Sequence, residues 1–184
     1  MRINHAIIAF ADYCYLAFLY WLSRGIFLQV FYVLMSMVSL MIASQFYQEL
    51  ASQITLWVPY SNPVQGVEVY FFKDISKFQL SHVYYAGVAF VFIYSLSYLV
   101  GRLLGVLLHL APVEHFDSLQ NNIISGFLAV LVCLLFMSMC LTILATVPMS
   151  FVQEKLWNSL FVRFLINDLP FFSQFLVRTW AVGL

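Results

Sequence analysis

Charged residues are scarce in this chain. Only 9% of its 184 residues are Asp, Glu, Lys or Arg, and the eight basic residues balance the eight acidic ones. A soluble domain is about 25% charged, so these residues are too few to make a surface that faces water. The zero net charge also argues against a nucleic-acid-binding protein. The composition therefore excludes an ordinary soluble domain and a polybasic binder.

Cysteine is also rare, with three residues at Cys14, Cys133 and Cys140. All three lie in apolar runs, where cysteine behaves as a small hydrophobic residue. Cys133 and Cys140 are seven positions apart, too far for a disulfide within one helix. We expect no disulfide.

Motifs for catalysis and for metal binding are missing as well. The chain has no Cys-x-x-Cys, no phosphate-binding glycine loop and no Gly-x-Ser-x-Gly, and its four histidines lack ligand spacing. A strip at His109, Glu114, His115 and Asp117 offers cation ligands, but a solvated loop is the favoured interpretation. The sequence therefore predicts a protein that is not an enzyme and that needs no cofactor or metal.

Apolar residues make up 64% of the chain, and its mean hydropathy is +0.93. Crossing the hydrocarbon layer of a bilayer takes about 20 helical residues. Four stretches are long enough, and they cover Ala6–Leu22, Ile26–Ala43, Val83–Ala111 and Ile123–Val147. The first is a retained span instead of a signal peptide, because Asp12 interrupts it and no small-x-small cleavage site follows. We predict an all-α, polytopic membrane protein with four transmembrane helices.

The bundle occupies residues 1–148 and includes a connection at 45–82, whose prolines and glycine break helices. The Trp, Tyr and Phe side chains of this connection predict that it lies among the lipid headgroups, and a re-entrant path stays open. The aromatic-rich tail, 149–184, follows Pro148. Ser159, Arg163 and Asn167 form a narrow polar stripe on a predicted helix of this tail, and Pro170 ends that helix. We predict an interfacial helical tail that docks on the bundle or on a partner, with Arg163 hydrogen-bonded across the contact.

Three charged residues in or beside the spans are candidate functional residues. Asp12 is the only acidic residue within a span, and ionisable groups there are commonly functional. We expect it to be neutral, hydrogen-bonded or interior-facing, and the alternative is a coupling or ion-pathway role. Arg24 and Arg102 lie at one membrane face, as interface anchors or as contacts to lipid phosphates.

Small residues mark close approaches between helices. Gly101 and Gly105 form a Gly-x-x-x-Gly motif in the third span, and Gly126 with Ala129 offers a similar surface in the fourth. Packing within the bundle is favoured over a dedicated dimer face.

Short motifs along most of the chain resemble one known family. They are Ile3-Asn4-His5-Ala6-Ile7-Ile8, Ser23-Arg24-Gly25, Ala43-Ser44-Gln45-Phe46-Tyr47, Asp117 to Gly126, and Trp157-Asn158-Ser159-Leu160 followed by Pro170. This order is similar to that of CvpA-family proteins, named for colicin V production. The chain departs from the family pattern at Asn4, Asn121 and Ala129-Val130, so the roles of those positions are not carried over.

The resemblance implies a multi-pass protein of the bacterial inner membrane that supports toxin production and export or envelope maintenance. It implies no established reaction and adds Arg24, Gly25, Asp117, Gly126 and Ser159 to the residues of interest. The expected partners are the lipid bilayer and a second copy or other envelope proteins, without nucleic acid. The alternative function is a small oligomeric transporter or channel, for which Gln29, Ser36 and Ser39 are the nearest pore-lining set.

Overall fold

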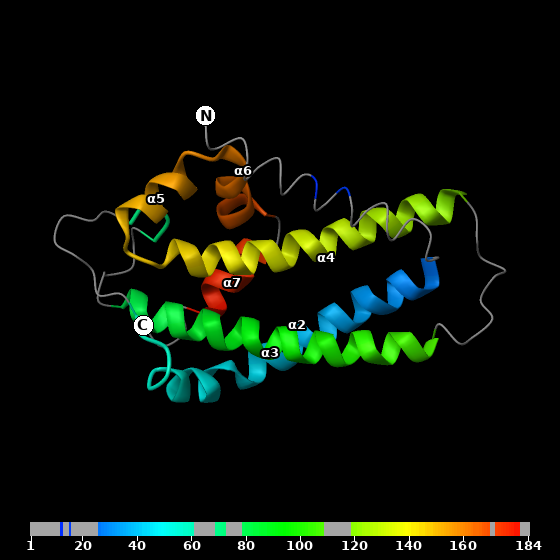
Figure 1. Ribbon diagram of the computed structural model, residues 1–184, viewed down its shortest axis with the longest axis horizontal. Helices are drawn as coiled ribbons and strands as arrows, with labels where there is room; N and C mark the ends of the chain where they lie inside the picture. Colours follow the sequence, from blue (N-terminus) through cyan, green and yellow to red (C-terminus); the bar gives the residue numbers. More distant parts are fainter. Residues whose placement is uncertain are drawn as a thin grey trace. The chain divides into compact units, whose positions relative to one another are not determined.

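The computed structural model describes Asp12, Tyr15 and residues 26–60, 69–72, 79–108, 119–169 and 172–180. In this part of the chain every regular element is a helix. Three helices, α2 (Ile26–Ile54), α3 (Leu80–Leu108) and α4 (Leu119–Ala145), are long and apolar enough to cross a membrane (Figure 1). The all-α, polytopic prediction is confirmed. The predicted span at 6–22 lies outside the described residues, apart from Asp12 and Tyr15, which are helical.

Helix α2 is longer than predicted. It continues past Ala43 to Ile54, so the connection begins at residue 55 instead of 45. Polar side chains in residues 45–54 mark the end of the apolar run, but they do not break a helix, and the first proline is Pro59. At about 1.5 Å per residue its 29 residues extend about 43 Å, whereas the hydrocarbon layer is about 30 Å thick.

The chain divides into two compact units. Unit 1 comprises residues 1–42 and 94–134, and unit 2 comprises residues 43–93 and 135–184. Each of the three long helices contributes one part to unit 1 and another to unit 2.

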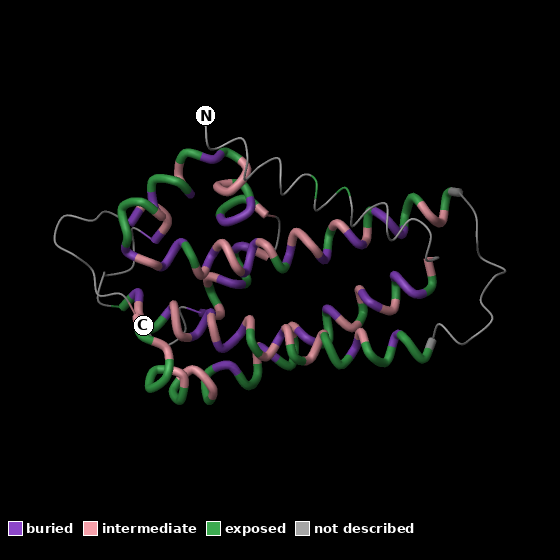
Figure 2. Tube along the Cα trace, in the orientation of Figure 1, coloured by how far each residue is buried: buried purple, intermediate pink, exposed green. Residues whose placement is uncertain are grey.

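Unit 1 contains the start of α2, the end of α3 and the start of α4. Leu28, Tyr32 and Ala129 form a buried cluster, and Phe31 packs against it. Buried positions recur at helical spacing along α2 (Figure 2). A buried hydrogen bond of 2.8 Å joins the Ser36 and Tyr94 hydroxyls of α2 and α3.

Unit 2 adds the connection and the tail to the other ends of the long helices. The tail consists of α5 (Ser150–Trp157), α6 (Leu160–Arg163), a π-helix η2 (Phe164–Asp168) and α7 (Phe172–Trp180). The core of unit 2 contains Val69, Phe72, Leu80, Ala145, Leu156 and Ile166. The connection, the tail and the span ends therefore share one core.

The tail turns sharply between η2 and α7. The segments Leu160–Asp168 and Phe172–Trp180 form an angle of 66°, and the pair is apolar enough to count as one broken span or a re-entrant loop. The helical run stops at Asp168, as predicted from Pro170. The helix expected to carry Ser159, Arg163 and Asn167 consists of two elements, because α6 begins after its N-cap Ser159 and a π-helix, η2, follows from Phe164.

Candidate functional site

Several sequence candidates are not brought together by the structure. Arg24, Gly25 and Asp117 lie outside the described residues. Asp12 is exposed and does not face the interior, and the neutral or hydrogen-bonded state expected for it stays a prediction.

The Gly101 and Gly105 motif lies inside unit 1. A Cβ added to Gly101 would lie 2.9 Å from the Met35 Cβ, and one added to Gly105 would lie 2.5 Å from ring atoms of Tyr32. Both glycines therefore let α3 approach α2, which confirms the expected packing within the bundle. Gly126, the candidate on α4, is buried.

Arg102 packs in the same region. Its guanidinium carbon lies 5.0 Å from the centroid of the Tyr32 ring, and its side chain is partly exposed. This is a cation–π contact to an aromatic residue that is itself buried. The role of Arg102 as a membrane-interface anchor stays a prediction.

The polar residues of α2 that a pore would need are all buried. Ser36 bonds to Tyr94, and Ser39 donates to the Met35 carbonyl at 2.7 Å. Both hydroxyls are therefore engaged within the chain. Gln29 differs, because its buried Oε1 accepts no hydrogen bond.

The predicted polar stripe of the tail does not form one face. Ser159 is buried and accepts a hydrogen bond from the Val162 N–H as the N-cap of α6, Arg163 is partly exposed, and Asn167 is exposed within η2. The π-helix changes the spacing of side chains after Arg163, so positions 159, 163 and 167 do not align. Arg163 packs over Trp157, and its Nε has no acceptor among the described residues, while the hydrogen bond expected across the contact stays a prediction.

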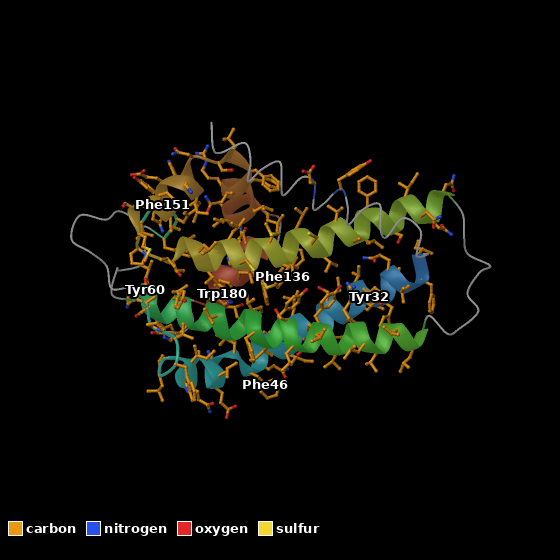
Figure 3. All side chains as sticks on the ribbon, in the orientation of Figure 1. Tyr32, Phe46, Tyr60, Phe136, Phe151 and Trp180 are labelled. Atoms are coloured by element: carbon orange, nitrogen blue, oxygen red, sulfur yellow. The ribbon has the colours of Figure 1, made fainter. Side chains whose placement is uncertain are left out.

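The end of the tail is nevertheless docked in unit 2. Trp180 on α7 is fully buried, with its ring centroid 5.9 Å from that of Phe90 (Figure 3). A Cβ added to Gly87 would lie 3.0 Å from both Ile143 and Trp180, so glycine makes room for the indole. We call Gly87, Phe90 and Ile143 the Trp180 slot.

Hydrogen bonds hold both halves of the tail to the long helices. The Tyr47 hydroxyl donates to the Thr179 carbonyl at 2.6 Å, which gives the C-terminal end of α7 a partner. The Ser138 hydroxyl of α4 donates to the Leu165 carbonyl in η2 at 2.8 Å. The docking predicted for the tail is confirmed, and the tail docks on the long helices of its own chain.

The carbonyls of residues 143–147, at the C-terminal end of α4, all accept hydrogen bonds. Pro148 has no N–H, so the helix ends, and carbonyls 143–147 must find other donors. Gln153 Nε2 donates to the carbonyls of Ala145 and Val147 at 2.9 Å each, and the Tyr60 hydroxyl donates to Thr146 at 2.9 Å. The N–H groups of residues 146 and 147 satisfy the carbonyls of residues 143 and 144. Gln153 Oε1 also accepts from the Tyr70 N–H, so one buried side chain joins α4, α5 and the connection.

Tyr60 lies in the connection beside Tyr84 and Tyr85. Partial burial, together with the two neighbouring phenols, raises the pKa of Tyr60 to about 12. The phenol therefore stays neutral at physiological pH and keeps donating to α4.

Sequence reasoning did not single out Gly87, Gln153, Tyr47 or Trp180. Gln153 was the most detectable, as an uncharged polar residue soon after Pro148, where a capping side chain is needed. In the described part of the chain no three His, Cys, Asp or Glu residues group as metal ligands. In unit 2, capping side chains and the Trp180 slot hold the tail against the long helices. We identify this docking region as the candidate functional site.

The fold and the docked tail define a multi-pass helical membrane protein. The model of the Colicin V production protein family matches residues 9–170, so the chain belongs to this family. It is 24% identical over 160 residues to the uncharacterized transmembrane protein YshB of Bacillus subtilis, covering 87% of this chain and 88% of that relative. No solved structure matches the chain. The family resemblance noted in the sequence is confirmed.

Proposed function

We propose that the protein is a non-enzymatic factor of the bacterial inner membrane that supports the production or export of a colicin V-like toxin, or envelope maintenance. Family membership and the helices able to span a membrane support this proposal. The observation that carries it is the docked tail, in which Trp180 and Tyr47 connect α7 to the long helices. In this proposal the docked tail presents the surface that other envelope components recognise.

Basic residues support an orientation with the tail in the cytoplasm. Six lie on the side of the termini, against Arg24 and Arg102 on the other, and they are Arg2, Lys73, Lys77, Lys155, Arg163 and Arg178. A single cysteine placed at position 65 in a chain without native cysteines should be protected from an impermeant thiol reagent in intact cells. Labelling at this position would reverse the orientation.

Complementation of a deletion strain tests the role of the tail. Loss of residues 151–184 should abolish toxin export or envelope integrity while the long helices remain inserted. Trp180→Ala should impair the phenotype while the long helices remain inserted, because its slot would lose most of its contacts. Phe175→Ala is the matched control, since Phe175 lies on the same helix and is 39% exposed. Full complementation by the truncated chain would contradict the proposal.

A transporter or channel is the alternative, supported by the buried polar side chain of Gln29. The engaged hydroxyls of Ser36 and Ser39 count against it. Ion flux in protein-containing vesicles that Gln29→Leu abolishes would favour the alternative.

A further inference from the structure

Trp157 stands in an aromatic cluster at the end of α5. Its ring stacks on Tyr70 with centroids 5.3 Å apart and contacts Phe71 edge-on at 5.6 Å. The cluster joins the C-terminal end of α5 to the connection between α2 and α3, and Trp157 and Tyr70 are both partly exposed. Trp and Tyr concentrate where a membrane meets water, so this cluster lies at the level of the lipid headgroups.

Arg163 lies over the Trp157 ring of this cluster. Its guanidinium carbon is 5.2 Å from the centroid of the Trp157 ring, and the side chain is partly exposed. Its Nε–H is buried without an acceptor, and no carboxylate of the described residues forms an ion pair with it. Arginine is always ionised in proteins, so this partly exposed cation is available to an anion that lies outside the described residues.

Two exposed apolar side chains lie near Arg163 in the sequence. Leu160, three residues earlier, is 76% exposed, and Phe164, the next residue, is 45% exposed. A soluble anion or an acidic protein loop would leave these two side chains in contact with water. An amphiphile with an anionic head and apolar chains would contact the cation and both side chains together.

We propose that Arg163, held by Trp157, binds the phosphate of an anionic phospholipid whose acyl chains pack against Leu160 and Phe164. A guanidinium fits phosphate because two parallel N–H groups point at two oxygens. The indole ring fixes the plane of the guanidinium before the lipid arrives, so less side-chain freedom is lost on binding. This lipid site is independent of the toxin-related role proposed above.

Lipid binding to the full chain tests the site. Purified protein in detergent is titrated with phosphatidylglycerol or phosphatidylcholine, and bound lipids are counted by native mass spectrometry. Wild type should prefer phosphatidylglycerol, and Arg163→Gln should weaken its binding about tenfold, which is the size of one charge-assisted hydrogen bond. Arg163→Lys should bind between the two, because an ammonium keeps the charge without the fork. Arg178→Gln, at an exposed arginine of α7, should leave binding unchanged.

Three results would overturn the lipid site. The first is the same phosphatidylglycerol affinity in Arg163→Gln and wild type, with a melting temperature showing that both are folded. The second is displacement of the lipid by excess inorganic phosphate, which would identify a soluble-anion site. The third is an acidic protein that co-purifies with wild type and is lost from Arg163→Gln, while lipid binding stays equal.

Discussion

Unit 1 and unit 2 hold the same three helices together by different means. In unit 1, α3 approaches α2 because Gly101 and Gly105 have no side chains, and Tyr32 lies against the second glycine. In unit 2, side chains from distant segments give partners to helix ends, and Trp180 fills a slot between α3 and α4. Apolar lipid gives little drive for helices to associate, so close packing and satisfied backbone groups are the two ways to hold them. The comparison predicts that substitutions that add side-chain volume destabilise unit 1. Substitutions that remove side-chain volume or a capping hydrogen bond should destabilise unit 2.

Trp180→Ala should have the largest effect on stability. Removing a buried Trp leaves a cavity and costs on the order of 3 kcal/mol or more. The melting temperature in detergent measures the loss, and proteolysis should begin in the tail. Trp57→Ala is the matched control, because Trp57 is 82% exposed and should be replaced with little effect. Equal melting temperatures for the two variants would mean that the slot does not stabilise unit 2.

Gln153→Leu should have the next largest effect. The substitution keeps the volume but leaves the Ala145 carbonyl and the Tyr70 N–H without their side-chain partner. Each buried unpaired group costs about 1–3 kcal/mol. Unfolding in denaturant measures the change, with Gln174→Leu, at an exposed position of α7, as the control. If both leucine variants unfold at the same midpoint, the cap is not needed.

Gly105→Ala distinguishes the units directly. Its new Cβ would overlap Tyr32 at 2.5 Å, so α2 or α3 must shift, at a cost of about 1–3 kcal/mol. Gly87→Ala in unit 2 meets its neighbours at 3.0 Å and should cost less. Amide hydrogen exchange should rise in the second half of α3 for Gly105→Ala and stay unchanged there for Gly87→Ala. Tyr32→Leu should reduce the cost of Gly105→Ala in a double-mutant cycle.

Alkaline pH should have the smallest effect, confined to unit 2. The pKa of Tyr60 rises from 10.0 to about 12 in the folded chain, so the folded state favours the neutral phenol. Its contribution to stability is therefore complete below pH 10 and is lost between about 10 and 12. Phenolate absorbance during an alkaline titration follows the change, and Tyr60→Phe should remove one late-titrating phenol. A Tyr60 that titrates at its ordinary pKa would show that its hydroxyl is not held by α4.

The long helices were predictable because a span requires an apolar run whose length the bilayer sets. The Gly101 and Gly105 contact was predictable because glycine spacing on a helix is local. The end of α2 was not predictable, because Gln45 and Glu49 end the apolar run but still continue the helix. The docking site was only partly predictable. Tyr47 and Thr179 are 132 residues apart in the chain, and nothing local to either residue reports the other.

The π-helix explains why the polar tail residues do not share the one helix face that their spacing predicted. Ser159, Arg163 and Asn167 have regular α-helical spacing, but the helix starts after Ser159 and widens at Phe164. Sequence periodicity assumes a constant number of residues per turn, and η2 does not have it. The arrangement of the polar tail residues therefore depends on the bond from Ser138 to Leu165 as well as on local sequence.

The division of the chain into units also sets an order of synthesis. All segments of unit 1 have been made once residue 134 is complete, whereas unit 2 waits for residues 135–184. At about 5–20 residues per second, translation of those residues takes about 3 to 10 s. During that interval the Trp180 slot and the Tyr47 hydroxyl have not yet met α7. A ribosome that stalls in this stretch would leave a chain with unit 1 complete and unit 2 open to quality-control proteases.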